Sequence, residues 1–137
     1  MWPDGVLDQV RLSFLGIPLD IRAYVGILSS LGVGGYRDPA FGAGLDYGDG
    51  HFTCFQFAYD WRRDNVENAH ALKAFIEQKK AEVRAEYKAR YGIEKDDIKF
   101  DIVAHSMGGL LTRYFLRYGD QALPEDGSLP ELNWAGR

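Results

Sequence analysis

The stretch IKFDIVAHSMGGLLTRYFLRY, residues 98–118, decides the fold that we expect for this chain. An apolar run typical of a β-strand, residues 98–103, leads into AHSMGG, residues 104–109, and an amphipathic run typical of a helix follows. A serine on a sharp strand-to-helix turn needs small residues two positions before and after it, because the two backbones approach each other there. Ala104 and Gly108 meet that need. The pattern predicts a nucleophile elbow that presents Ser106.

The predicted elbow implies catalytic roles for two residues. Ser106 is the expected nucleophile, and the backbone N–H of Met107, at the start of a helix, is placed to stabilise an oxyanion. The serine needs a histidine to accept its proton and an acid to orient that histidine, and both normally follow the serine in the chain. The three histidines, His51, His70 and His105, all precede it. We interpret His105 as a packed neighbour, His70 as a surface residue and His51 as lying at the other end of a strand, and we expect negligible turnover from this chain alone.

The preceding sequence supplies the other expected elements. Residues 52–59 read as a buried strand, and Asp64 with Glu67 predicts a capping box at the start of a long helix that ends at Gly92. A first helix is expected from Asp20 to Gly32, after a surface segment without a clear period over residues 6–15. A glycine-rich loop is expected over residues 33–50.

This order, helix-strand-helix-strand-helix, predicts an α/β fold whose strands form a parallel sheet. We expect residues 1–137 to form a single partial domain. It would lack an upstream strand with its oxyanion loop, and the downstream acid and histidine.

Composition excludes several classes of protein. The chain has 137 residues, 46% of them hydrophobic, and a formal net charge of −4, so it resembles a soluble globular domain and gives no electrostatic case for nucleic-acid binding. Neither a signal peptide nor an apolar run of membrane-spanning length is visible. Cys54 is the only cysteine and reads as a small core residue. A strand would scatter Asp49, His51 and Cys54, so we predict no metal site, and we expect no cofactor.

Several of these motifs together resemble one family. Tyr59-Asp60-Trp61-Arg62, the long helix after it, and FDIVAHSMGGL, residues 100–110, are similar to the lecithin:cholesterol acyltransferase-like branch of the α/β-hydrolases, which holds lipid acyltransferases and phospholipases. The resemblance implies an α/β-hydrolase core in which Ser106 accepts the acyl group and Met107 gives one oxyanion N–H. It also implies a lipid ester as acyl donor, with water or an alcohol as acceptor. Ala104 stands where glycine is commoner in the family.

The YDWR motif, residues 59–62, has two open interpretations. Tyr59, Asp60, Trp61 and Arg62 would lie at the carboxyl end of a strand, on the sheet edge expected for Ser106, and could shape the substrate cleft. Alternatively they are structural, with Asp60 and Arg62 pairing locally and Trp61 packing at the rim. The sequence leaves both readings open.

The first functional hypothesis is a serine-dependent lipid ester hydrolase or O-acyltransferase of lipid metabolism, of which this chain is a fragment. The alternatives are a non-catalytic α/β-hydrolase-like binding domain and a general carboxylesterase without lipid preference. The expected partner is a lipid or other ester substrate, and peripheral contact with a membrane or lipid surface is compatible with it. Nothing in the sequence indicates an oligomeric state.

Overall fold

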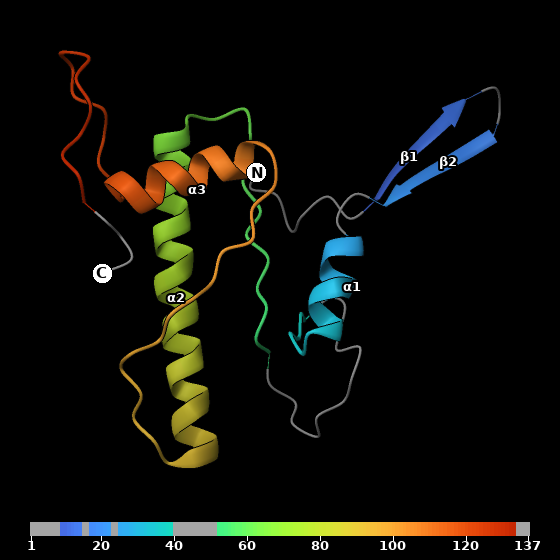
Figure 1. Ribbon diagram of the computed structural model, residues 1–137, viewed down its shortest axis with the longest axis horizontal. Coiled ribbons are helices and arrows are strands. Elements are labelled where there is room, and N and C mark those ends of the chain that lie inside the picture. Colours follow the sequence, from blue (N-terminus) through green and yellow to red (C-terminus); the bar gives the residue numbers. More distant parts are fainter. Residues whose placement is uncertain (1–8, 15–16, 23–24, 40–51, 134–137) are drawn as a thin grey trace. The chain divides into compact units, whose positions relative to one another are not determined.

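The computed structural model describes residues 9–14, 17–22, 25–39 and 52–133. The chain divides into two compact units, Met1–Ala58 and Tyr59–Arg137. The first unit contains β1 (Gln9–Phe14), β2 (Ile17–Arg22) and α1 (Val25–Val33), and the second contains α2 (Asn65–Tyr91) and α3 (Met107–Tyr118) (Figure 1). Each unit is described by itself.

In the first unit, β1 and β2 form an antiparallel hairpin with Phe14 opposite Ile17 and Gln9 opposite Arg22. This register pairs apolar positions with apolar positions, as in Leu12 with Leu19, and it brings Arg11 opposite Asp20. We expected residues 6–15 to be an irregular surface segment and a helix to begin at Asp20, and both expectations are wrong. The missed signal is the alternation of apolar residues at every second position from 10 to 14 and from 17 to 21.

The helix α1 confirms the later part of that expected first helix. It ends in a glycine cap, in which the Tyr36 N–H donates to the Leu31 carbonyl at 3.0 Å and the Gly35 N–H donates to the Gly32 carbonyl at 3.1 Å. Gly35 takes the left-handed position with φ 92°, which a residue with a Cβ occupies only at a cost. The cap therefore uses Gly35 rather than the predicted Gly32, which lies inside the helix.

The helix α2 is the long helix that the sequence predicts. Its N-cap is Asp64, whose carboxylate accepts from the Val66 N–H at 2.6 Å, and its C-cap is Gly92 with φ 67°. Glu67 pairs with the Arg63 guanidinium in place of the reciprocal bond of a capping box. Both ends of α2 therefore follow from local sequence signals.

The core of the second unit lies where α3 packs on the first part of α2 (Figure 1). Ala69 and Leu72 of α2 are buried there, and α3 contributes Leu111, Phe115 and Tyr118. The contributing positions of α3 lie three or four residues apart, which places them on one face of the helix. This packing fixes the direction of α3 and hence the position of the turn that precedes it.

The predicted parallel sheet is absent from the described residues, so the expected parallel-sheet fold class is wrong. The sheet that they contain is the two-stranded antiparallel hairpin β1–β2. The expected strand at residues 52–59 starts by bonding to the segment after α1, since Thr53 and Cys54 donate to the Arg37 carbonyl at 3.0 and 2.9 Å. Residues 98–103 carry no strand pairing either, and the Ile98 N–H donates to the nearby Asp96 carbonyl at 3.1 Å. A β-strand requires a neighbouring strand for its backbone hydrogen bonds, and an apolar run alone does not provide one.

Candidate active site

Ser106 occupies a strained turn immediately before α3. Its backbone has φ 54° and ψ −127°, and it is the one non-glycine residue with positive φ in the described part of the chain. Such a conformation costs about 1–3 kcal/mol and persists only where the surrounding structure enforces it. Here the turn is held by the Gly108 N–H, which donates to the His105 carbonyl at 3.0 Å, and by the Gly109 N–H, which donates to the Ser106 carbonyl at 2.9 Å.

The turn leaves the hydroxyl of Ser106 and the N–H of Met107 available. Ser106 is exposed, and its side chain does not cap α3 even though serine is a common N-cap residue. The amides of Gly108 and Gly109 have backbone acceptors, whereas none is found for the Met107 N–H among the described residues. A hydroxyl and a free amide at the positive end of a helix can attack a carbonyl and stabilise the resulting oxyanion.

The two sides of the turn approach closely at Gly108. A Cβ placed on Gly108 would lie 4.0 Å from the Cβ of Ala104 and 3.7 Å from the Tyr59 hydroxyl oxygen. A Cβ on the neighbouring Gly109 would have nothing within 4 Å. The need for a small residue therefore applies to position 108 more than to position 109. Because its hydroxyl lies beside Gly108, Tyr59 is the residue of the YDWR motif that contacts the elbow.

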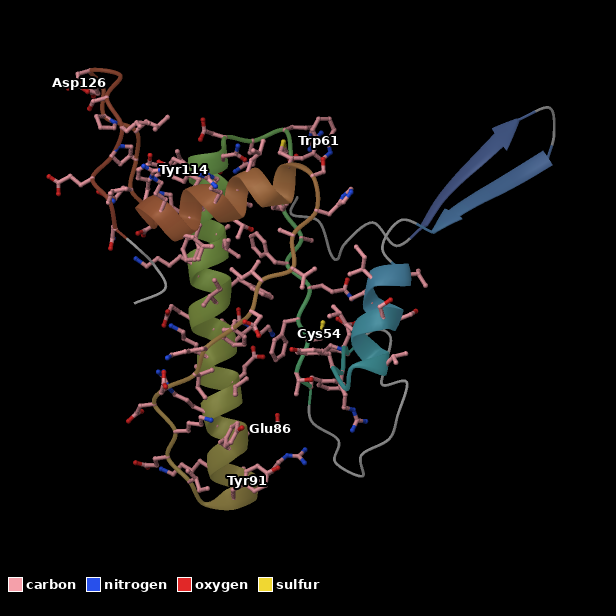
Figure 2. All side chains as sticks on the ribbon, viewed as in Figure 1. Cys54, Trp61, Glu86, Tyr91, Tyr114 and Asp126 are labelled. Carbon is pink, nitrogen blue, oxygen red and sulfur yellow. The ribbon has the colours of Figure 1, made fainter. Side chains whose placement is uncertain are left out.

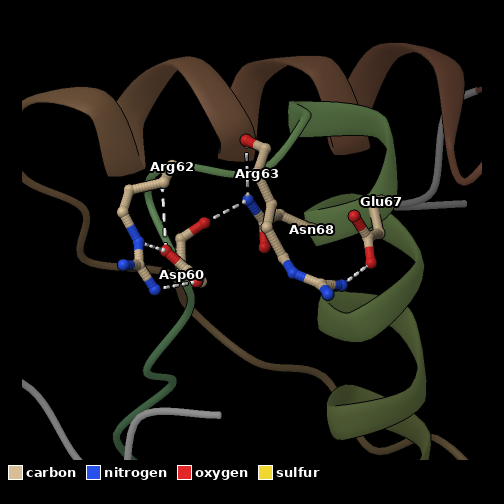
Figure 3. Close-up of polar contacts among 5 residues, drawn as sticks. All are labelled: Asp60, Arg62, Arg63, Glu67 and Asn68. Carbon is tan, nitrogen blue, oxygen red and sulfur yellow. Dashed lines mark hydrogen bonds and ion pairs between the residues drawn. The ribbon is translucent and has the colours of Figure 1, made fainter. Parts of the chain in front are cut away.

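Asp60 and Arg62 form a closed local pair (Figure 3). The Arg62 Nε and Nη2 atoms donate to the two carboxylate oxygens of Asp60 at 2.8 and 2.7 Å, and the Arg62 backbone N–H donates to Oδ1 at 3.1 Å. These bonds from Arg62 hold the pKa of the Asp60 carboxyl well below its usual range. A carboxylate held ionised in this way is unsuited to act as a general acid near neutral pH.

The same segment is tied to the start of α2. The Asp60 carbonyl accepts from the Arg63 N–H at 3.0 Å, which closes a turn over residues 60–63, and from the amide Nδ2 of the buried Asn68 at 3.1 Å (Figure 3). Trp61, inside this turn, is 70% exposed. The backbone of the turn is thus fixed by polar contacts while its indole faces solvent.

The histidines do not complete a triad in the described structure. His70 is half-exposed on α2, with Nδ1 3.7 Å from Asp120, and Lys73 donates to both oxygens of the same carboxylate at 3.0 Å. That bond from Lys73 lowers the pKa of the Asp120 carboxyl. Asp120 lies two residues after the last residue of α3 and Ser106 directly precedes the first, and the helix between them is about 18 Å long. His105 is exposed beside Ser106 in the chain, and His51 lies outside the described residues.

The described residues also bear on a metal site, a membrane span and a reactive thiol. The described residues contain no cluster of three histidine, cysteine or acidic side chains that could hold a metal ion. None of the helices in that part of the chain is long and apolar enough to cross a membrane. Cys54 is partly buried in the first unit, and burial raises the pKa of its thiol, with a smaller contribution from Asp38. A raised pKa keeps a thiol protonated and therefore unreactive.

Comparison with known proteins agrees with the resemblance noted in the sequence. Searches of curated proteins and of solved structures found no match to this chain. The model of the lecithin:cholesterol acyltransferase family matches residues 48–135, which is well over half of the chain and includes both the YDWR motif and the elbow. The family is one of lipid acyltransferases and related lipases, so an activity on lipid esters is indicated at that level. The chain therefore belongs to the lecithin:cholesterol acyltransferase family.

Proposed function

We propose that Ser106 is the nucleophile of a serine-dependent lipid ester hydrolase or O-acyltransferase. The observation that carries the proposal is the backbone of Ser106, at φ 54° and ψ −127° directly before α3. A serine held at positive φ directly before a helix N-terminus presents its hydroxyl outward, which is what a nucleophile elbow requires. A glycine would adopt this backbone without strain, so the serine at this position supports a role for its hydroxyl.

In the proposed reaction the Ser106 hydroxyl oxygen attacks the carbonyl carbon of the lipid ester, and its proton passes to a histidine base. The carbonyl oxygen becomes an oxyanion that the Met107 N–H stabilises. The intermediate collapses with loss of the lipid alcohol, which takes up the proton, and an acyl-serine ester remains. Water or a second alcohol then attacks that ester and releases the acid or the new ester, and Ser106 regains its proton.

The base is the part that the described residues do not supply, because His70 is held at the other end of α3. The proposal therefore predicts that the reactive serine is present while turnover by this chain alone is negligible. Loss of a triad base typically costs several orders of magnitude in rate. This is also the observation that favours the second candidate, a non-catalytic binding domain that keeps the elbow.

A fluorophosphonate probe tests the assignment, because it reacts covalently with activated serines. We expect slow labelling of the chain, located at Ser106 by peptide mass spectrometry and abolished in Ser106→Ala. Ser13→Ala serves as the control for loss of an unrelated hydroxyl and should label as the wild type does. Labelling that survives in Ser106→Ala would refute the assignment of the nucleophile to Ser106. No labelling of the folded chain even at high probe concentration would favour the binding domain.

The preference for lipid has its own test. If imidazole added as an external base supports ester cleavage, the rates on long-chain and short-chain p-nitrophenyl esters can be compared. A lipid-directed enzyme should prefer the long acyl chain. Preference for acetate or butyrate esters would favour a general carboxylesterase.

A further inference from the structure

Asn68, in the first turn of α2, is a polar side chain among the buried residues of that helix. It is fully buried, and Ala69 beside it is buried as well. Its amide Nδ2 donates to two main-chain carbonyls, that of Asp60 at 3.1 Å and that of Arg63 at 3.4 Å (Figure 3). Its Oδ1 is buried and has no hydrogen-bond partner among the described residues. A buried acceptor without a partner destabilises a fold, so stability alone does not explain an asparagine at this position.

The hydrogen bond from Asn68 is not needed to satisfy the Asp60 carbonyl. That carbonyl already accepts from the Arg63 N–H at 3.0 Å, which closes the turn over residues 60–63. Trp61, inside this turn, is labelled in Figure 2. An apolar side chain at position 68 would leave the Asp60 carbonyl bonded and would bury no unpartnered oxygen. Asn68 instead connects the first and last residues of the turn to the start of α2.

The residue directly before this turn reaches the elbow. A Cβ on Gly108 would lie 3.7 Å from the Tyr59 hydroxyl oxygen and 4.0 Å from the Ala104 Cβ. Gly108 is two residues after Ser106, and its N–H donates the hydrogen bond that closes the turn in which Ser106 has positive φ. A displacement of Tyr59 would therefore move a group that lies against the elbow.

We propose that Asn68 is a positioning residue for Ser106 and that it acts through Tyr59. Asn68 fixes the turn over residues 60–63, the turn fixes the place of Tyr59, and Tyr59 supports the elbow at Gly108. This inference rests on the proposed function, because it gives Asn68 a part in the reactivity of the serine. It also accounts for the buried Oδ1, since folds keep locally unfavourable groups where function requires them.

Asn68→Leu separates positioning from stability. Leucine has nearly the shape of asparagine and removes the donor and the unpartnered acceptor together, so the urea midpoint should stay the same or rise. We expect fluorophosphonate labelling of Ser106 to slow about fivefold, as loss of one hydrogen bond would produce. Asn65→Leu is the matched control, because Asn65 is the first residue of α2 and also has a buried Oδ1 without a partner among the described residues. The control should label at the parent rate.

A double-mutant cycle tests whether Asn68 acts through Tyr59. Tyr59→Ala should slow labelling by itself, and Asn68→Leu added to it should slow labelling little further, because the contact with Gly108 is already lost. Asn68→Ala is a second variant that leaves a cavity and lowers the urea midpoint, yet it should slow labelling as much as Asn68→Leu while both are folded. Additive losses, labelling of Asn68→Leu at the parent rate, or losses that follow the order of the urea midpoints would overturn the proposal.

Hydrogen exchange measured by NMR distinguishes this proposal from the proposed function. The amides of Gly108 and Gly109 are hydrogen-bonded within the turn that holds Ser106, and they report on that turn without any reaction at the serine. We expect both amides to exchange about fivefold faster in Asn68→Leu and at the parent rate in Asn65→Leu. If the parent chain is not labelled at Ser106, the proposed function fails, while faster exchange would still show that Asn68 positions the turn. Unchanged exchange in Asn68→Leu would overturn the positioning role.

Discussion

The close approach at Gly108 leads to a matched pair of substitutions in the first turn of α3. Gly108→Val and Gly109→Val make the same change of side chain one residue apart, with the same small effect on intrinsic helix propensity. At Gly108 the Cβ alone would lie 3.7 Å from the Tyr59 hydroxyl and 4.0 Å from the Ala104 Cβ, so it fits. The γ-carbons of valine extend about 1.5 Å further, into that space. At Gly109 nothing lies within 4 Å of the Cβ.

The magnitude follows from the packing. Overfilling a close contact costs about 1–3 kcal/mol, so Gly108→Val should be less stable than Gly109→Val by that amount. For a chain of this length 1 kcal/mol corresponds to roughly 3–5 °C in Tm. Alanine should be tolerated at both positions, and each Gly→Ala variant should gain about 0.5–1 kcal/mol from helix propensity.

Urea unfolding followed by circular dichroism measures the four variants, and fluorophosphonate labelling reports on the turn itself. We expect Gly108→Val to label more slowly than Gly109→Val, because a displaced turn changes the orientation of the Ser106 hydroxyl relative to the Met107 N–H. Valine variants whose stabilities agree within about 0.5 kcal/mol would refute the argument from close approach. A Gly108→Ala variant that is as damaging as Gly108→Val would show instead that the turn requires glycine itself.

Two further predictions concern the segment between the YDWR motif and α2. The Asp60 pKa lies below its ordinary value of 3.8 because Arg62 donates to it, so the pair stabilises the protein above that pH and loses its effect as pH falls through the folded value. Arg62→Gln should therefore lower the urea midpoint at pH 7 by a small amount, and the difference should shrink between pH 4 and pH 2; a constant difference would contradict the assignment. Asp64→Ala should destabilise α2 by about 1 kcal/mol through loss of the bond to the Val66 N–H, while Asp64→Asn should retain most of it, and equal losses in both variants would rule out capping by the side chain.

The helices α2 and α3 could be predicted because their signals are local. Asp64 and Gly92 mark both ends of α2 within a few residues of the groups that they cap, and the spacing of apolar residues in α3 defines its buried face. The glycine and alanine around Ser106 likewise predicted a tight turn before a helix. The family followed from the same short motifs, since the matched residues 48–135 include them.

The sheet could not be predicted in this way. Residues 52–59 and 98–103 have strand-like composition, yet strand formation depends on hydrogen bonds to residues that are distant in the chain. In the structure, Thr53 and Cys54 at the start of the first segment donate hydrogen bonds to the Arg37 carbonyl, and the second segment pairs with no strand. The hairpin β1–β2 was not predicted because the alternation of apolar residues in each strand is short, and the apolar residues that follow it have a helical spacing.

Sequence by itself determined which chemistry this chain can carry: a serine between small residues, a helix amide after it, and three histidines that all precede it. Tertiary structure alone decided the strained backbone of Ser106, the closed pair of Asp60 with Arg62, the exposure of Trp61 and the placement of His70 beside Asp120, beyond the far end of α3 from Ser106. The physical reason is the distance along the chain over which each kind of interaction acts. Capping, periodicity and turn propensity act over a few residues and can be read along the chain, whereas ion pairing, exposure and strain depend on which distant segments pack together.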